Sequence, residues 1–129
     1  MASHYWKAHP GPHEVSRIRH AIADYTLSQG VPQHLVDDVS LAVSEVVSNC
    51  IIHAYPQGHD DGEIMITATV NGAEVTIRVV DDGVGLVPRV DSPGAGLGLA
   101  IAGKVARRMV VECPQRGGTE VRMTFREAA

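Results

Sequence analysis

The chain has 129 residues, of which 44% are hydrophobic and 20% charged, and a formal net charge of −4 at pH 7. This length fits one domain, residues 1–129, with a sizeable core, and the acidic balance argues against a nucleic-acid partner, which usually needs a basic surface. No stretch approaches about eighteen consecutive apolar residues, and the amino terminus has no apolar signal region. We therefore expect a cytoplasmic protein without a membrane partner.

Cysteine and histidine usage limits the possible chemistry. Cys50 and Cys113 each lie in an apolar run and form no CxxC pair, so we expect two reduced core thiols. The seven histidines are scattered and form neither an HExxH motif nor a Cys/His cluster. A zinc site is therefore not expected.

The first half of the chain predicts a short strand followed by two helices. Residues 3–10 suit a strand closed by a Pro-Gly-Pro turn, and apolar residues at helical spacing predict a helix over 13–29, with Gly30 as its stop. A second helix opens at Pro32 and continues to about residue 54. It is apolar around most of its circumference, so we expect it to be buried.

The second half predicts two hairpins around a third helix. Alternating apolar residues mark the first hairpin, and Asn-Gly at 71–72 marks its turn. The expected elements are strands at 63–70 and 73–80, a helix from Leu97, and strands at 109–113 and 119–125. Helices that interrupt antiparallel hairpins predict an α+β fold with two layers.

A file of polar residues runs through the second helix. Glu45, Asn49 and His53 are spaced four and four, which places them on one face of an α-helix. An Asn amide oxygen can bind Mg²⁺, which takes few protein ligands, and a Glu one turn away can act as a general base. Glu45 and Asn49 would equally suit a hydrogen-bonded pair on an exposed stripe.

Two glycine clusters flank the segment before the third helix. The first is DDGVG with Gly83 and Gly85, and the second is GAGLG with Gly94, Gly96 and Gly98. Glycines at the start of a helix let free N–H donors approach a phosphate closely. Neither cluster is a dinucleotide fingerprint or a Walker A loop, and glycine-rich turns also occur for structural reasons alone.

Asp81 is the first residue of DDGVG, at the end of a Val-rich strand. A buried carboxylate without a partner is costly, so a partner is expected. A carboxylate on the floor of a pocket can accept a hydrogen bond from an exocyclic amine, and adenine carries such an amine.

Three ordered motifs resemble the GHKL ATPase superfamily, which includes gyrase-type topoisomerases, MutL and histidine kinases. SEVVSNCIIHAY, residues 44–55, is similar to its N box, and DDGVG and GAGLGLAI are similar to its two glycine boxes. The Gly-Gly-Thr at 117–119 is also typical of it. The resemblance implies the Bergerat-type two-layer sandwich, with a mixed, mostly antiparallel sheet and helices on one face.

Within the superfamily the chain looks most like the anti-sigma-factor serine/threonine kinases of the sporulation and general-stress type. Ile52 occupies the position where histidine kinases usually carry Lys, and His53-Ala-Tyr follows the pattern of the serine kinases. A single helix around His13 and His20 is too little for a phosphoacceptor hairpin. These departures count against a histidine kinase.

The resemblance implies a protein that binds ATP or ADP with Mg²⁺. Its partners would be a sigma factor and an anti-anti-sigma protein of the STAS type, whose serine it would phosphorylate, and it could form a homodimer. Asn49 would bind Mg²⁺, Glu45 would be the base, and Asp81 would read the adenine amine with Thr119 beside it in a water-linked network. His53 would orient the site or serve packing. The nucleotide would be lined by Gly83, Gly85, Gly94, Gly96, Leu97 and Gly98.

The segment between the glycine clusters departs from the family pattern. Only eight residues, 86–93, separate the clusters, and Arg89 is their one cation, whereas relatives usually carry a longer ATP lid. Two alternatives therefore remain open beside the kinase. One is a nucleotide-binding, partner-switching module without phosphotransfer, and the other is a stand-alone ATP-binding domain of a histidine-kinase-like system. The Glu45–Asn49 pair favours the kinase.

Overall fold

The computed structural model describes residues 1–54, 62–83, 97–114 and 117–127, with the backbone alone at 53, 54, 97 and 98. Its elements agree with the expected ones to within a few residues at each end. In chain order they are β1 (Ala2–Ala8), α1 (Glu14–Ser28), α2 (Gln33–Asn49), η1 (Cys50–Ala54), β2 (Ile64–Asn71), β3 (Glu74–Asp81), α3 (Leu97–Val105), β4 (Arg108–Glu112) and β5 (Thr119–Arg126).

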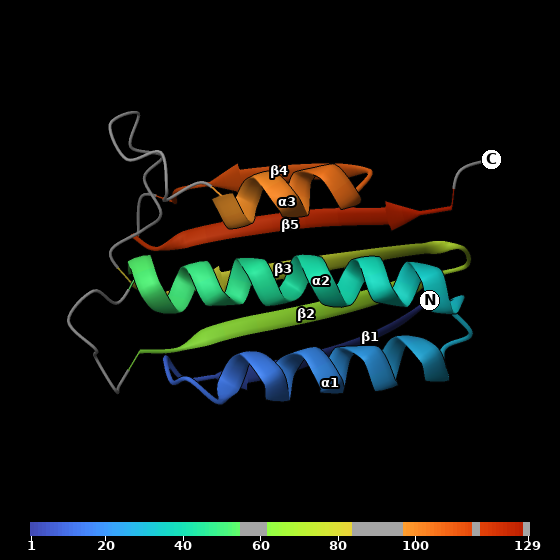
Figure 1. Cartoon of the computed structure of the whole chain (residues 1–129), viewed down its shortest axis with the longest axis horizontal. Helices are drawn as coiled ribbons and strands as arrows, with labels where there is room; N and C mark the ends of the chain where they lie inside the picture. Colours follow the sequence, from blue (N-terminus) through green and yellow to red (C-terminus); the bar gives the residue numbers. More distant parts are fainter. Residues whose placement is uncertain (55–61, 84–96, 115–116, 128–129) are drawn as a thin grey trace.

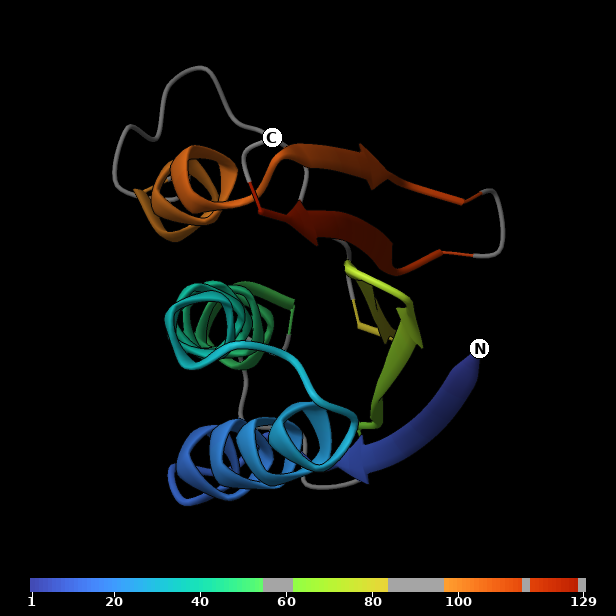
Figure 2. The ribbon, with the colours of Figure 1, turned by 90° about the vertical axis from the view of Figure 1, so that its right-hand side faces the viewer.

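The described strands form one sheet in the order β1-β2-β3-β5-β4. The three helices lie side by side on one face of this sheet, with α2 between α1 and α3 (Figures 1 and 2). This arrangement confirms the predicted two-layer α+β sandwich. The four described strand pairs are all antiparallel, so in this part of the chain the sheet is antiparallel rather than mixed.

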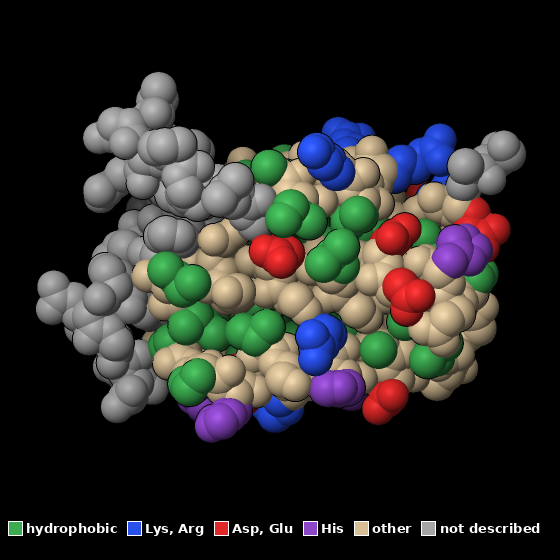
Figure 3. All heavy atoms as spheres, in the orientation of Figure 1, with side chains coloured by type: hydrophobic (Ala, Val, Ile, Leu, Met, Phe, Trp, Pro, Cys, Tyr) green, Lys and Arg blue, Asp and Glu red, His purple; other side chains and the backbone are tan. Residues whose placement is uncertain are grey.

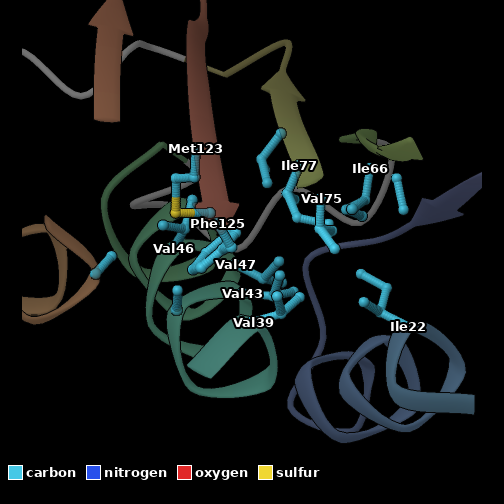
Figure 4. Packing of buried hydrophobic residues seen from close by; sticks show 14 of the residues in the cluster. Ile22, Val39, Val43, Val46, Val47, Ile66, Val75, Ile77, Met123 and Phe125 are labelled. Carbon is cyan, nitrogen blue, oxygen red and sulfur yellow. The ribbon is translucent and has the colours of Figure 1, made fainter. Parts of the chain in front are cut away.

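The core lies between α2 and the middle of the sheet. The side of β2 that faces the helices carries Ile64, Ile66 and Ala68, each fully buried, because side chains alternate between the two faces of a strand. Figure 4 shows the valines of α2 pointing towards side chains of β3 and β5. These core residues are Val39, Val43, Val46 and Val47 of α2, Val75 and Ile77 of β3, and Met123 and Phe125 of β5.

The hairpin between β2 and β3 turns one residue later than the Asn-Gly pair suggested. Asn71 pairs with Glu74, so the two loop residues are Gly72 and Ala73. Gly72 has φ 60°, and among the described residues only glycines have positive φ. A positive φ at the first central position alone defines a type II′ turn, which suits the twist of the strands.

One smaller expectation was wrong. Cys113 is exposed rather than in the core, because it follows the last residue of β4. Ile101 of α3 is 40% exposed, whereas Ala102 and Ala106 are buried. The small Ala102, together with the partly buried Leu99 and Val105, thus forms the side of α3 that packs against the core, next to α2.

Figure 3 shows the outer face of the helical layer, on which hydrophobic side chains lie among charged ones. The exposed large hydrophobic residues on the described helices are Leu27, Leu41, Ile52 and Ile101. None of the described helices is both long enough and apolar enough to cross a membrane.

Candidate functional site

Four element ends meet at one end of the sandwich. The carboxyl end of α2, the last residue of β3, the start of α3 and the start of β5 all lie at the left-hand end of Figure 1. The sheet register places Asp81 of β3 opposite both Ile64 of β2 and Thr119 of β5. The fold therefore brings the predicted residues of three separate motifs to the same end of the molecule.

Asp81 is 2% exposed, and both of its carboxylate oxygens accept hydrogen bonds. Oδ1 accepts one from the backbone N–H of Gly83 at 2.9 Å, and Oδ2 accepts one from the thiol of Cys50 at 3.5 Å. The backbone of Thr119 also bonds this carboxyl group, and Thr119 is itself fully buried. These donors hold the carboxylate in one orientation, as the cost of burying a charge requires.

Asp82 makes different hydrogen bonds from its neighbour Asp81. Its Oδ1 accepts a hydrogen bond from the backbone N–H of Glu63 at 2.9 Å, and its own N–H donates to the carbonyl oxygen of Glu63. Asp82 is exposed, whereas Asp81 points into the sandwich. Of the two acids in the motif, only Asp81 is thus placed to meet a ligand in the interior.

Burial raises the pKa of Asp81 above its ordinary value of 3.8, and the hydrogen bonds from Gly83, Cys50 and Thr119 offset only part of this rise. As the pH rises through 3.8, the unfolded chain loses this proton while the folded protein keeps it. The contribution of Asp81 to the free energy of unfolding therefore falls with rising pH until the raised pKa has been passed.

We expect this effect in a comparison of the ligand-free protein with Asp81→Asn, whose side chain does not ionise. The free energy of unfolding of the wild type, minus that of the variant, should decrease as the pH rises from about 4 towards the raised pKa of Asp81. Urea denaturation at a series of pH values measures this difference. A difference that stays level or increases over the range would contradict the raised pKa.

Gly118 lies directly behind Asp81. It has φ +80°, and a Cβ at this position would collide with the backbone carbonyl oxygen of Asp81. The collision involves backbone, so it cannot be relieved by rotating a side chain. Only glycine therefore lets β5 approach the end of β3 this closely, which in turn positions Thr119.

We expect Gly118→Ala to destabilise the protein by about 1–2 kcal/mol more than Gly72→Ala. Both glycines have positive φ, so both variants share the cost of placing a Cβ in the left-handed region. Gly72 has nothing within 4 Å of the added Cβ, so it serves as the matched control. Chemical denaturation measures both losses, and equal losses would show that the close approach to Asp81 is not required.

Asn49 and Glu45 lie on α2 as predicted. Asn49 is only 7% exposed, and its buried amide nitrogen Nδ2 finds no hydrogen-bond partner within the described part of the chain. Glu45 is half-buried one turn earlier, about 6 Å along the helix axis. A buried amide nitrogen without a partner is unusual in a folded protein and indicates that a group outside the described residues completes its bonding.

The helical conformation changes from an α-helix to a π-helix directly after Asn49. Residues 50–54 form a π-helix, η1, rather than a continuation of the α-helix. The spacing of four residues that places Glu45 and Asn49 on one face therefore does not carry on to His53, whose side chain lies outside the description. π-helical turns are frequent at functional sites.

The remaining candidates are described in part or not at all. Gly83 follows β3 and donates to Asp81, and Leu97 and Gly98 form the first turn of α3, with only their backbone described. Gly85, Gly94, Gly96 and Arg89 lie outside the described residues, so their predicted roles stay predictions.

Sequence reasoning overlooked two residues of the site. Cys50 was expected to be an ordinary core thiol, yet it contacts the Asp81 carboxylate. Gly118 was noted only as part of a motif, although the backbone approach requires it. Their positions, directly beside Asn49 and Thr119, were the only available signals.

The arrangement suits a ligand that offers both donors and acceptors. The Asp81 carboxylate can accept a hydrogen bond from an amine, and the Asn49 amide can bond a polar group or supply a metal ligand. The two are brought close because Cys50, the neighbour of Asn49 in the chain, contacts Asp81 directly. A buried acceptor beside the unsatisfied N–H donor of Asn49 fits a nucleotide, because its base carries an amine donor and its phosphate oxygens are acceptors.

Known proteins agree with this interpretation. The family described as histidine kinase-like ATPase domain matches residues 9–125. A protein of Thermoanaerobacter sp. (strain X514) named anti-sigma F factor is 35% identical over 100 residues, covering 69% of this chain and 68% of that protein. A protein of Clostridium novyi (strain NT) with the same name is 29% identical over 119 residues, covering 84% and 82%.

Two solved structures share the fold. The RsbU and RsbW domains of a Mycobacterium tuberculosis protein superpose with a TM-score of 0.75 at 19% identity, covering 98% of this chain and 32% of that one. A histidine kinase domain from Erythrobacter litoralis gives a TM-score of 0.62 at 24% identity, covering 88% and 59%. The chain belongs to the histidine kinase-like ATPase domain family, and nucleotide binding follows from that membership.

Proposed function

We propose that this chain is an ATP·Mg²⁺-binding regulator of the anti-sigma type that phosphorylates a serine on an anti-anti-sigma partner with a STAS fold. The observation that carries the proposal is the unsatisfied buried amide of Asn49 beside the firmly held carboxylate of Asp81. The similarity to proteins named anti-sigma F factor, at 35% identity over two thirds of the chain, supports the regulatory role.

Asp81 would recognise the base of the nucleotide. Its carboxylate is an acceptor, and three donors of the protein already fix its orientation. The exocyclic amine of adenine can donate to it, whereas a purine with a carbonyl oxygen at that position would present a second acceptor. Thr119 would border the base beside Asp81, at the start of β5.

Asn49 and Glu45 would act at the phosphate end of the nucleotide. The unsatisfied amide nitrogen of Asn49 would donate to a phosphate oxygen, and its side-chain oxygen would hold the Mg²⁺ ion, which when bound neutralises charge on the phosphates. Glu45, one turn away on the same face, would accept the proton of the partner's serine hydroxyl as the serine oxygen bonds the γ-phosphorus and ADP leaves. Gly98, in the first turn of α3, would place backbone N–H groups near the phosphates.

Two other functions remain as alternatives. A partner-switching module would bind nucleotide and partner without transfer, and a stand-alone domain of a histidine-kinase-like system would serve a phosphorelay. Glu45 favours the kinase over the first alternative because a carboxylate in this position supplies the base that transfer needs. Ile52, which stands where histidine kinases carry Lys, counts against the second.

The test is phosphate transfer from labelled ATP to each STAS protein encoded in the same genome. We expect one of them to be labelled on a serine, giving an ester that survives acid, while its Ser→Ala variant stays unlabelled. Acid-labile label would support the histidine system instead. Nucleotide binding without transfer to any partner would support the partner-switching module. Co-purification with a sigma factor in the presence of ATP tests the second half of the proposal.

A further inference from the structure

We propose that Cys50 is a positioning residue of the base pocket, whose thiol holds Asp81 in the orientation that selects a 6-aminopurine over a 6-oxopurine. This inference rests on the proposed role of Asp81 and adds a residue to it. It assigns a function to a side chain that would otherwise be an ordinary core thiol, since Cys50 is 1% exposed within the hydrophobic cluster.

The geometry carries the inference. The two oxygens of the Asp81 carboxylate are held by different parts of the fold. Oδ1 accepts a hydrogen bond from the backbone N–H of Gly83, two residues later and just after β3. Oδ2 is held across the layers, by the Cys50 thiol at 3.5 Å, thirty-one positions away in the chain. Among the described residues, Cys50 is thus the side chain of the helical layer that donates a hydrogen bond to Asp81.

The position of Cys50 at the end of α2 explains how the thiol reaches Asp81. Cys50 is the first residue of η1, and it directly follows Asn49, the last residue of α2. In an α-helix, consecutive residues point about 100° apart, so Asn49 and Cys50 face different directions. Asn49 can therefore meet the phosphate end of a nucleotide while Cys50 turns towards the carboxylate beneath the base.

A carboxylate held in one orientation discriminates between a 6-aminopurine and a 6-oxopurine better than a carboxylate that can rotate. An oxygen that accepts a thiol hydrogen still has a second lone pair, which can accept an amine hydrogen. A 6-oxopurine would instead direct its own acceptor at the carboxylate and leave buried groups unpaired, which is the strongest source of discrimination in a binding site. If Asp81 could rotate away, this penalty would be relieved and the selectivity would fall.

The experiment compares ATP with inosine triphosphate, which carries a carbonyl oxygen in place of the 6-amino group. Calorimetric titration gives the two affinities for the wild type, Cys50→Val, Cys50→Ala and Cys50→Ser. The Val variant keeps an apolar side chain without a donor, the Ala variant removes the donor without adding volume, and the Ser variant keeps a donor. A thermal melt of each variant reports whether it folds, so the Ala variant decides the question if the Val variant does not.

We expect the preference for ATP over inosine triphosphate to fall about threefold to tenfold in the Val and Ala variants, the value of one neutral hydrogen bond. The Ser variant should lie closer to the wild type. A preference within twofold of the wild type in both donor-free variants would overturn the inference, as would an equal fall in the Ser variant. A packing role alone would weaken both nucleotides together and leave their ratio unchanged.

The outcomes also separate this inference from the function on which it rests. If the wild type binds neither nucleotide, the proposed function fails. If it prefers ATP, loses that preference with Asp81→Asn and keeps it in the donor-free Cys50 variants, only the role of Cys50 fails.

Discussion

Replacement of Glu45 by Gln is expected to leave ATP binding near the wild-type level and to lower phosphate transfer by about 10²–10⁴-fold. Gln keeps the volume and the hydrogen-bonding reach of the side chain but cannot accept the serine proton. Phosphate incorporation into the partner, measured beside a nucleotide titration, separates the two effects. Undiminished transfer would remove Glu45 as the base.

Two further variants make this result specific. Asp38→Asn neutralises another acid of α2, two turns earlier and about 10 Å along the axis, and should leave transfer unchanged. Asn49→Ala should lose nucleotide affinity as well as transfer, unlike the Glu45 variant. It should lose the Mg²⁺-dependent part of the nucleotide affinity together with transfer, because its buried side-chain oxygen is the proposed metal ligand.

Replacement of Asp81 by Asn is expected to lower the affinity for both ATP and ADP about tenfold to more than a hundredfold, with the fold intact. A buried charged hydrogen bond is worth on the order of 1.5–3 kcal/mol, and Asn cannot offer the same acceptor to the adenine amine without reorganising the bonds from Gly83 and Cys50. Calorimetric titration measures the loss.

Asp82→Asn is the matched control for this prediction. It changes the charge of the neighbouring residue by the same amount, and its remaining oxygen can still accept the N–H of Glu63. We expect its nucleotide affinity to stay within a few fold of the wild type. A folded Asp81→Asn protein with wild-type affinity, or an equal loss in both variants, would contradict the assignment of Asp81 to the base.

Most of the fold could be predicted because it depends on local periodicity. The alternation in β2 and the apolar circumference of α2 both follow from burial against the same core, so residue type alone revealed them. The buried face of α3 was not predicted, because helix packing there buries the small Ala102 and leaves the larger Ile101 partly exposed. Residue volume, rather than hydrophobicity, decided which side of that helix is buried.

Only those residues of the site that belong to the sequence motifs could be predicted. Asp81 and Asn49 were expected to be functional, and the structure buries both at one end of the sandwich. The π-helical turn at Cys50–Ala54 has no sequence signature, since those residues would also suit an α-helix. The bond between Cys50 and Asp81 joins residues thirty-one positions apart, so tertiary packing alone brings them together.

The most direct test of the account is a calorimetric titration of the intact chain with ATP, with Mg²⁺ and then with a chelator in its place. If Asn49 and Asp81 form the two ends of one nucleotide pocket, the wild type should bind one ATP per chain saturably, and more tightly with Mg²⁺. Asn49→Ala should abolish the Mg²⁺-dependent difference, and Asp81→Asn should reduce affinity under both conditions. No saturable binding at millimolar ATP, or an affinity that is the same with and without Mg²⁺, would contradict the account.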